Sequence, residues 1–135
     1  MAEVVVGAAT FVVAAALVST PPTATVAIEP VTTTLVQAGV LADVTITPAR
    51  VGANELHLVM SPPGGSLQPV GRVTARLTAL DRDVPPFAVD LAVAGVNHWT
   101  SPLQFPYGGR WRLEFVAEVR PLELVQYRAE FTVTE

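Results

Sequence analysis

The chain has 135 residues and a formal net charge of −4; half of its residues are apolar and only 15% are charged. Eight arginines, no lysine and no basic run argue against nucleic-acid binding and against docking on anionic lipid. The chain is long enough for one folded domain with a real core, and the absence of cysteine excludes disulfides, thiol nucleophiles and thiolate metal ligands.

Residues 1–19 are strongly hydrophobic, with no charged side chain from Val4 to Val18. About 17 helical residues cover roughly 25 Å, close to the thickness of a bilayer core. Small residues such as Gly7 suit close packing against other helices. We therefore predict a transmembrane helix, the last of a truncated bundle. A secretory signal peptide, although Glu3 stands where a basic residue is usual, and a buried helix of a globular domain remain alternatives.

Residues 20–36 are rich in proline and threonine. Pro21, Pro22 and Pro30 do not fit a continuing helix and favour extended chain, so this segment is predicted to be a tether. No basic residue precedes Arg50. The positive-inside tendency therefore gives no reason to keep this side of the helix in the cytoplasm, and it favours the exterior.

From residue 37 to 135 the apolar residues recur at every second position, which is typical of half-buried antiparallel strands. The clearest case is residues 108–120, where Trp111, Leu113 and Phe115 alternate with charged side chains. About seven short strands separated by Pro- and Gly-rich turns predict a mainly β fold. We expect an immunoglobulin-like antiparallel β-sandwich, although the cysteine pair of true immunoglobulin domains is absent.

The other predicted strands follow the same rule, and the loops between them contain glycine, proline, asparagine or aspartate. Turns are expected at residues 50–54, 61–66, 81–83 and 95–97. The residues expected to face the core are Val40, Ala42, Val44 and Ile46; Leu56, Leu58 and Met60; Val73, Ala75, Leu77 and Ala79; Phe87, Val89, Leu91 and Val93; and Tyr127, Ala129, Phe131 and Val133.

The two histidines of the chain are the candidate metal ligands. His57 lies on the outward side of its predicted strand, and His98 faces out if Trp99 enters the core. Two outward histidines on neighbouring strands can hold a copper or zinc ion through their imidazole nitrogens. The alternative is that the two side chains never meet. Met60 is three residues from His57, on the opposite face of a straight strand, and is expected in the core.

Other candidate chemistry is sparse. Asp81 and Asp83 offer two carboxylates on one turn, but the further oxygen ligands of a calcium loop do not follow, so a solvated turn is expected. The outward charges of residues 108–120 are expected to pair across strands or simply to be solvated. The sequence has no nucleophile elbow, phosphate loop or paired-histidine zinc motif, and we expect no enzymatic activity.

Several segments together resemble one family. Four features of the chain occur in the same order in the C-terminal region of the copper-resistance D (CopD)/YcnJ-like family. They are the apolar helix running into the double proline, a Thr-Pro-Ala-Arg-Val-Gly-Ala-Asn-Glu-Leu-His segment, a Gly-Val-Asn-His-Trp corner and the long final strands. The corresponding residues here are Leu17–Pro22, Thr47–His57, Gly95–Trp99, Leu103–Trp111 and Leu113–Arg120.

This resemblance implies a last transmembrane helix followed by an extracytoplasmic β-sandwich, in a membrane protein of copper transport or copper resistance. It places His57 and His98 where such domains often carry histidine, and so implies a copper ion as the ligand. The implied partners are the membrane, the remaining helices of a copper transporter, or a copper chaperone. The chain departs from the family in lacking the membrane bundle, and it has no N-terminal histidine of the CopC type.

The sequence thus predicts a helix at residues 1–19, a tether at 20–36 and an extracytoplasmic sandwich at 37–135. We expect weak copper binding or partner docking. The alternatives are a metal-free interaction domain that caps a membrane transporter, and a secreted sandwich released after signal cleavage.

Overall fold

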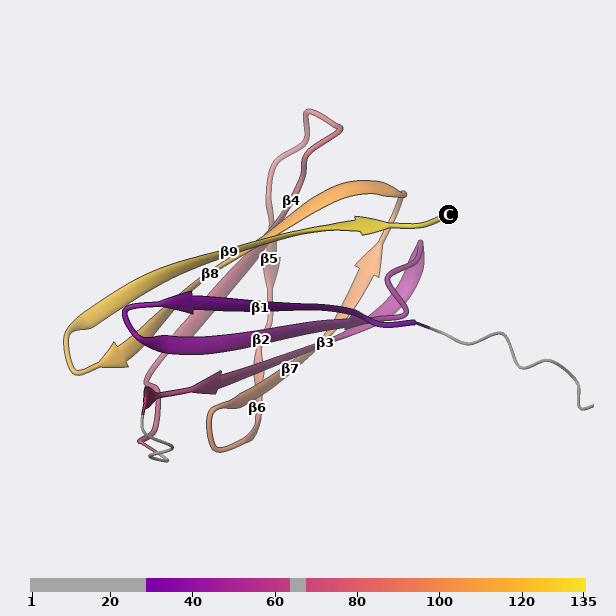
Figure 1. Cartoon of the computed structure of the whole chain (residues 1–135). Coiled ribbons are helices and arrows are strands. Elements are labelled where there is room, and N and C mark those ends of the chain that lie inside the picture. Colours follow the sequence, from indigo (N-terminus) through magenta and orange to yellow (C-terminus); the bar gives the residue numbers. More distant parts are fainter. Residues whose placement is uncertain (1–28, 64–67) are drawn as a thin grey trace, which may run out of the picture.

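The computed structural model describes residues 29–63 and 68–135 of the chain. These residues form nine β-strands in two antiparallel sheets, which lie as two layers (Figure 1). The prediction of a mainly β, antiparallel fold is confirmed, with nine strands in place of about seven. The predicted transmembrane helix at residues 1–19 and most of the predicted tether lie outside the described residues. Among the described residues, no helix is long and apolar enough to cross a membrane.

One sheet has five strands, in the order β1-β2-β3-β7-β6, and every neighbouring pair is antiparallel. It carries both histidines, and it is called here the five-stranded sheet. Its strands are β1 (Val31–Gln37), β2 (Val40–Thr47), β3 (Gly52–Ser61), β6 (Ala92–Gly95) and β7 (His98–Phe105).

The other sheet has four strands, in the order β5-β4-β8-β9, and it is called the four-stranded sheet. Its longest pair, β8 and β9, forms a hairpin whose register runs from Gly109 opposite Val133 to Arg120 opposite Glu123. Its strands are β4 (Val73–Ala79), β5 (Phe87–Val89), β8 (Gly109–Arg120) and β9 (Glu123–Val133).

The core lies between the two sheets and is built by their alternating apolar residues. Trp111 of β8 is 1% exposed, and its ring meets the ring of Phe105 from β7 edge to face, with centroids 5.1 Å apart. In β2 the pattern of buried and half-buried residues alternates without a lapse. Met60 is 2% exposed and points into this core, as predicted. The period-two pattern therefore identified which side of these strands is buried.

The sandwich begins earlier than the sequence predicted. Residues 31–37, of which 31–36 were assigned to the tether, form β1 and pair with β2 from Val31 opposite Ile46 to Gln37 opposite Val40. Three consecutive threonines supply the β-branched side chains that suit a strand, and Leu35 is half-buried against the core. The C-terminal end of the predicted tether is therefore corrected: residues 31–36 belong to the sandwich.

The stretch predicted as one strand through Phe87 and Val93 is two short strands in different sheets. β5 pairs with β4, whereas β6 pairs with β7, so the chain crosses from one sheet to the other at residues 90–91. Val89 is buried, and Phe87, on the same side of β5, is 43% exposed but has its ring 5.9 Å from that of the core residue Trp111. Val93, after the crossing, is 77% exposed on the edge strand β6. The prediction that Val93 lies in the core is wrong, since alternation cannot register a change of sheet.

The turn before β3 is held by a single side chain. The amide of Asn54 donates to the carbonyls of Arg50 (2.7 Å) and Gly52 (2.9 Å), and its oxygen accepts the N–H of Arg50 (3.2 Å). Gly52 has a φ of 101°, as a residue without a side chain readily allows. The turn was predicted, and Asn54 stabilises it through hydrogen bonds. This fixes the start of the strand that carries His57.

The corner before β7 is also held by an asparagine. Asn97 has a φ of 52° and is buried, and its side chain accepts the N–H of Val70 (2.7 Å) and donates to the carbonyl of Gln68 (2.9 Å). Its own carbonyl accepts the N–H of Met60 at the end of β3 (2.9 Å). The corner is therefore tied to β3, and it places His98 as the first residue of β7.

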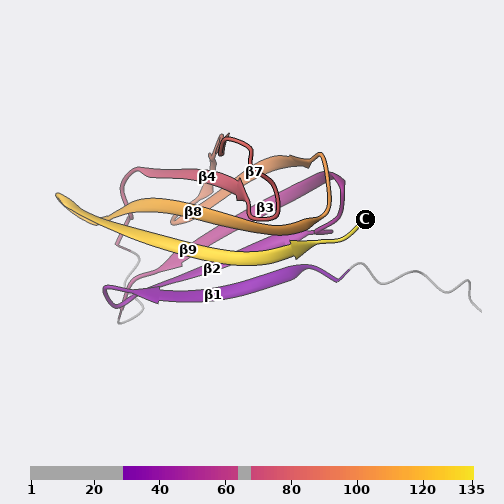
Figure 2. The same ribbon diagram turned by 90° about the horizontal axis from the view of Figure 1, so that it is seen from above.

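The two sheets meet along one side, where β1 and β9 run next to each other (Figure 2). The hydroxyl of buried Tyr127 lies within hydrogen-bonding distance of the carbonyls of Gln37 (3.3 Å) and Val40 (3.2 Å). At the other end of this seam, the N–H of Thr134 donates to the carbonyl of Ala49 (3.0 Å). The seam thus joins the first and last strands of the domain.

Candidate metal centre

Both histidines lie on the outer face of the five-stranded sheet. In the register between β3 and β7, His57 is opposite Thr100 and His98 is opposite Val59. The histidines are therefore diagonal neighbours across one strand pair, a separation that long side chains can bridge. The neighbours Leu58 and Trp99 are buried, which turns the histidines away from the core.

The two imidazole rings are in contact. Nδ1 of His57 lies 3.1 Å from Nε2 of His98, and the ring centroids are 5.3 Å apart. Of the two alternatives drawn from the sequence, the structure therefore favours the one in which the histidines meet. At hydrogen-bonding distance, two neutral rings share one proton, donated by one nitrogen and accepted by the other. That the pair holds a metal ion stays a prediction.

A third polar side chain contacts this pair. Oε1 of Glu55 lies 2.7 Å from Nε2 of His57, on the ring nitrogen that does not face His98. This contact was not predicted from the sequence. The available signal was the Glu-x-His spacing on a strand, because residues i and i+2 point to the same face. The site is thus a chain of Glu55, His57 and His98.

The spacing of the two ring nitrogens suits adjacent ligands of one metal ion. With metal–nitrogen bonds of about 2.0 Å, the observed 3.1 Å separation corresponds to an angle of roughly 100° at the metal. This lies between the tetrahedral and square-planar values. Among the described residues, no group of three histidine, cysteine, aspartate or glutamate side chains is arranged to hold a metal ion. Two protein ligands leave the remaining coordination positions to water or to a partner.

In the predicted turn at residues 81–83, the carboxylate of Asp81 is hydrogen-bonded to Arg110. Asp81 accepts the backbone N–H of Arg110 (2.7 Å) and two guanidinium N–H groups of the same residue (2.9 and 2.7 Å). The side-chain hydrogen bonds from Arg110 lower the pKa of Asp81 below its usual value. The turn itself was predicted from the sequence. Through these hydrogen bonds, the carboxylate of Asp81 fixes the position of the start of β8.

The outer face of the four-stranded sheet carries cross-strand ion pairs, as predicted for the charges of residues 108–120. Glu114 of β8 is 8% exposed and lies between Arg76 of β4 (2.7 Å) and Arg128 of β9 (3.2 Å). Arg112 pairs with Glu130 at 2.7 Å. Two carboxylates thus pair with three guanidinium groups across three adjacent strands.

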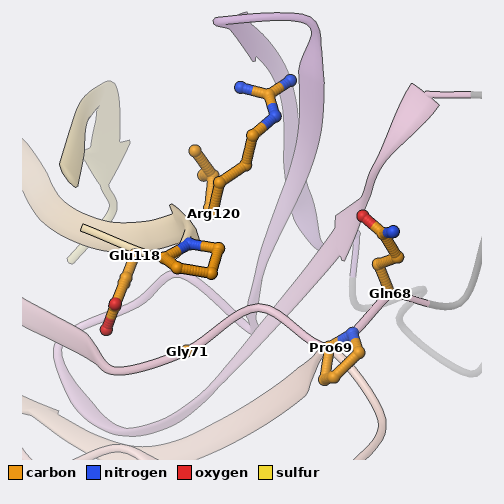
Figure 3. A pocket seen from close by; sticks show the side chains of 7 residues that line it. Gln68, Pro69, Gly71, Glu118 and Arg120 are labelled. Carbon is orange, nitrogen blue, oxygen red and sulfur yellow. The ribbon is translucent and has the colours of Figure 1, made fainter. Parts of the chain in front are cut away.

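A pocket of about 410 Å³ lies away from the histidines, between the segment at Gln68–Gly71 and the end of β8 (Figure 3). Two of its lining residues carry a charge. The carboxylate of Glu118 accepts the N–H of Leu122 (3.2 Å), and Arg120 donates to Glu123 (3.0 and 2.9 Å). Both groups are therefore engaged in the β8–β9 turn.

No protein-family model and no curated protein matches the sequence. Solved structures do match the fold. A DUF4426 family protein from Pseudomonas aeruginosa superposes with a TM-score of 0.59 at 8% identity, covering 76% of this chain and 96% of that one. FetP from uropathogenic Escherichia coli, expressed in the periplasm, superposes with a TM-score of 0.56 at 10% identity, covering 78% of this chain and 95% of that one.

A copper-bound variant of the same FetP gives a TM-score of 0.56 at 10% identity, covering 78% of this chain and 96% of that one. At such identities the similarity shows a shared fold alone. None of these structures is described as a CopD protein, so the resemblance to that family stays a prediction.

Proposed function

We propose that this chain is a non-catalytic, extracytoplasmic β-sandwich domain that binds copper weakly through His57 and His98. It serves a membrane protein of copper transport or copper resistance, as its resemblance to the CopD family implies. The observation that carries the proposal is the 3.1 Å separation of two imidazole nitrogens from neighbouring strands. Imidazole is a preferred ligand of copper and zinc.

The geometry of the pair favours one mode of coordination. Two ligands about 2.0 Å from a metal must lie about 4 Å apart to bind it in a linear arrangement. The observed 3.1 Å is shorter, and it suits two adjacent positions of a four-coordinate ion. Tetragonal coordination by nitrogen and oxygen is typical of Cu(II). We therefore expect Cu(II), with water completing the coordination, to fit better than linear Cu(I).

The exposure of the site supports transfer of the ion more than storage. The side chain of His57 is 41% exposed and that of Glu55 is 61% exposed. An ion held by two protein ligands at such a surface exchanges readily, because its open positions accept a ligand from another molecule. A copper chaperone or the helices of a transporter are the expected partners.

The proposed location rests on two observations. The apolar residues 1–19 precede the sandwich and are predicted to anchor it in a membrane. No basic residue lies between them and Arg50, which favours the exterior for the sandwich. The fold is also shared with FetP, which was expressed in the periplasm and is copper-bound in one structure. The first supports a membrane anchor, and both support a sandwich outside the cytoplasm.

The test is a titration of Cu(II) into the full chain in detergent, followed by calorimetry and by the NMR signals of the two histidines. Loss of a supporting hydrogen bond at a metal ligand costs about 10- to 100-fold in affinity, so loss of one of two ligands should cost about 100-fold or more. We expect this fall for His57→Ala and for His98→Ala. Thr100→Ala, opposite His57 on the same face, is the matched control and should bind as the unaltered chain does.

Equal copper affinity in the unaltered chain and in the double-histidine variant would overturn the proposal. So would Cu(II) that broadens other signals and leaves both histidine signals unchanged.

A metal-free interaction domain is the alternative, and one observation favours it. The edge strand β6 is exposed along its whole length, with Val93 77% exposed, and Val96 beyond it is 66% exposed. An exposed apolar edge without charged side chains is a ready template for a further strand. This alternative predicts that Val93→Lys abolishes partner capture, and that replacing both histidines leaves the copper affinity unaltered.

A further inference from the structure

Glu55 contacts His57 on the side of the imidazole ring that faces away from His98. Its carboxylate oxygen lies 2.7 Å from Nε2 of His57, while the other ring nitrogen of His57, Nδ1, faces His98. Glu55 and His57 are two residues apart on β3 and point to the same face of the sheet. The contact is therefore set by the strand itself and needs no distant packing.

The chemistry of a carboxylate fixes where the proton of this imidazole lies. An ionised carboxylate only accepts hydrogen bonds, so Nε2 of His57 must carry the hydrogen. In the neutral ring the other nitrogen, Nδ1, then has a free lone pair. That lone pair faces Nε2 of His98 at 3.1 Å, so the shared hydrogen is donated by His98. The carboxylate of Glu55 therefore sets the donor and the acceptor in both hydrogen bonds, the one from His57 to Glu55 and the one from His98 to His57.

We infer that Glu55 is a positioning residue, which holds His57 as the tautomer whose Nδ1 is free to bind a metal ion. This inference rests on the proposed function of the histidine pair, and it names a residue that the pair requires. A ligand histidine commonly donates its second N–H to a carboxylate, which sets the ring orientation and raises the basicity of the ligand nitrogen. Glu55 has this geometry.

Glu55 is not itself a ligand of the ion that would lie between the histidines. Its oxygen is bonded to the ring nitrogen on the far side of His57, whereas the ion is held by Nδ1. This agrees with the finding that no three acidic or imidazole side chains of the described residues are arranged around one metal position. Coordination is therefore expected through Nδ1 of His57 and Nε2 of His98. When the ion binds, the hydrogen that Nε2 of His98 donates in the metal-free pair moves to Nδ1 of the same ring, which stays neutral.

The tautomer can be measured in the metal-free full chain by the imidazole nitrogen-15 signals, which distinguish a protonated from an unprotonated ring nitrogen. We expect His57 to carry its hydrogen on Nε2 and to have an unprotonated Nδ1. Glu55→Ala should give His57 a mixture of both tautomers. Glu55→Gln keeps an acceptor oxygen without the charge, so it should retain part of the preference.

The matched control is Asp43→Ala, which removes one negative charge from the same sheet face, where Asp43 bonds to Thr34. We expect it to leave the tautomer of His57 and the affinity for Cu(II) unchanged. Glu55→Ala should lower this affinity about tenfold, the lower end of the usual range, because the carboxylate is largely exposed.

Two results would overturn the inference. One is a His57 ring that carries its hydrogen on Nδ1 in the unaltered chain, whatever the copper affinity. The other is an unchanged affinity and an unchanged tautomer in Glu55→Ala. If the tautomer behaves as expected but the unaltered chain binds no Cu(II), the proposed function fails while Glu55 still positions the ring.

Discussion

The outer faces of the two sheets use their polar side chains differently. On the four-stranded sheet, Arg76, Glu114 and Arg128 form a continuous row of opposite charges from three strands. On the five-stranded sheet, the two imidazoles contact each other and a single carboxylate. The charged groups of the first arrangement are paired with one another within the fold. The second leaves ring nitrogens at the surface, where a ligand can reach them.

This difference indicates what each face does. Cross-strand ion pairs stabilise a sheet and fix its register, and their removal should change the free energy of unfolding. A pair of half-buried histidines that contact mainly each other contributes little to stability, and its removal should change ligand binding. The predictions below test this separation.

The largest effect on stability is expected on the four-stranded sheet, from Glu114→Ala. This change leaves Arg76 and Arg128 without their shared carboxylate, and hydrogen bonds to charged groups contribute about 1.5–3 kcal/mol when buried. Because both arginines are more than half exposed, we expect the free energy of unfolding to fall by about 1–2 kcal/mol. Urea denaturation measures this change.

The matched control is Glu130→Ala on the same face, which has one partner, Arg112, and is itself largely exposed. Its expected loss is below about 0.5 kcal/mol. Equal losses for the two variants would show that burial of Glu114 adds nothing. A change in copper affinity on replacing Glu114 would contradict the assignment of stability to one face and ligand binding to the other.

A smaller effect is expected at the seam between the sheets, from Tyr127→Phe. The change removes the hydroxyl that bonds to the carbonyls of Gln37 and Val40, at a cost of about 1 kcal/mol. Burial raises the pKa of Tyr127 above 10.0. This group therefore stabilises the fold fully below pH 10.0, and its contribution falls as the pH rises through the higher value of the folded state.

Thermal unfolding at a series of alkaline pH values measures both effects. Tyr127→Phe should be less stable than the unaltered chain at neutral pH, and the difference should shrink as the tyrosine of the unaltered chain ionises. A constant difference up to strongly alkaline pH would contradict the assignment to Tyr127.

The smallest effect is expected from Asp81→Asn, in the exposed turn after β4. Its hydrogen bonds from Arg110 lower the pKa of Asp81 below 3.8, so they stabilise the fold above that pH and lose their effect as the pH falls through the lowered value. The Tm of the unaltered chain should therefore exceed that of Asp81→Asn at neutral pH and approach it in acid. Asp83→Asn, in the same turn, should leave the Tm unchanged at both pH values.

Much of the fold could be predicted from the sequence, because burial on one face of a strand leaves a period of two. Trp111 and Tyr127 were placed in the core for this reason, and both are 1% exposed. Predictions from the alternation of apolar and polar residues failed where the path of the chain changes while the alternation continues. Val93 keeps the alternation but follows the crossing between sheets, and residues 31–36 were assigned to a tether because of the prolines before them.

The candidate site could be predicted only in part. Strand alternation placed His57 and His98 on outward faces, but it carries no information on which strands are neighbours or in what register. The contact requires β3 beside β7 with His98 opposite Val59, which depends on the whole topology of the sheet. The contact of Glu55 with His57 could have been predicted more easily, since their spacing of two residues alone puts both side chains on one face of the strand.

The most direct test of the account is electron paramagnetic resonance of the full chain loaded with one equivalent of Cu(II). We predict hyperfine coupling to two imidazole nitrogens in the unaltered chain, and to one in each of His57→Ala and His98→Ala. A copper signal with the same nitrogen coupling in the unaltered chain and in the double variant would contradict the account.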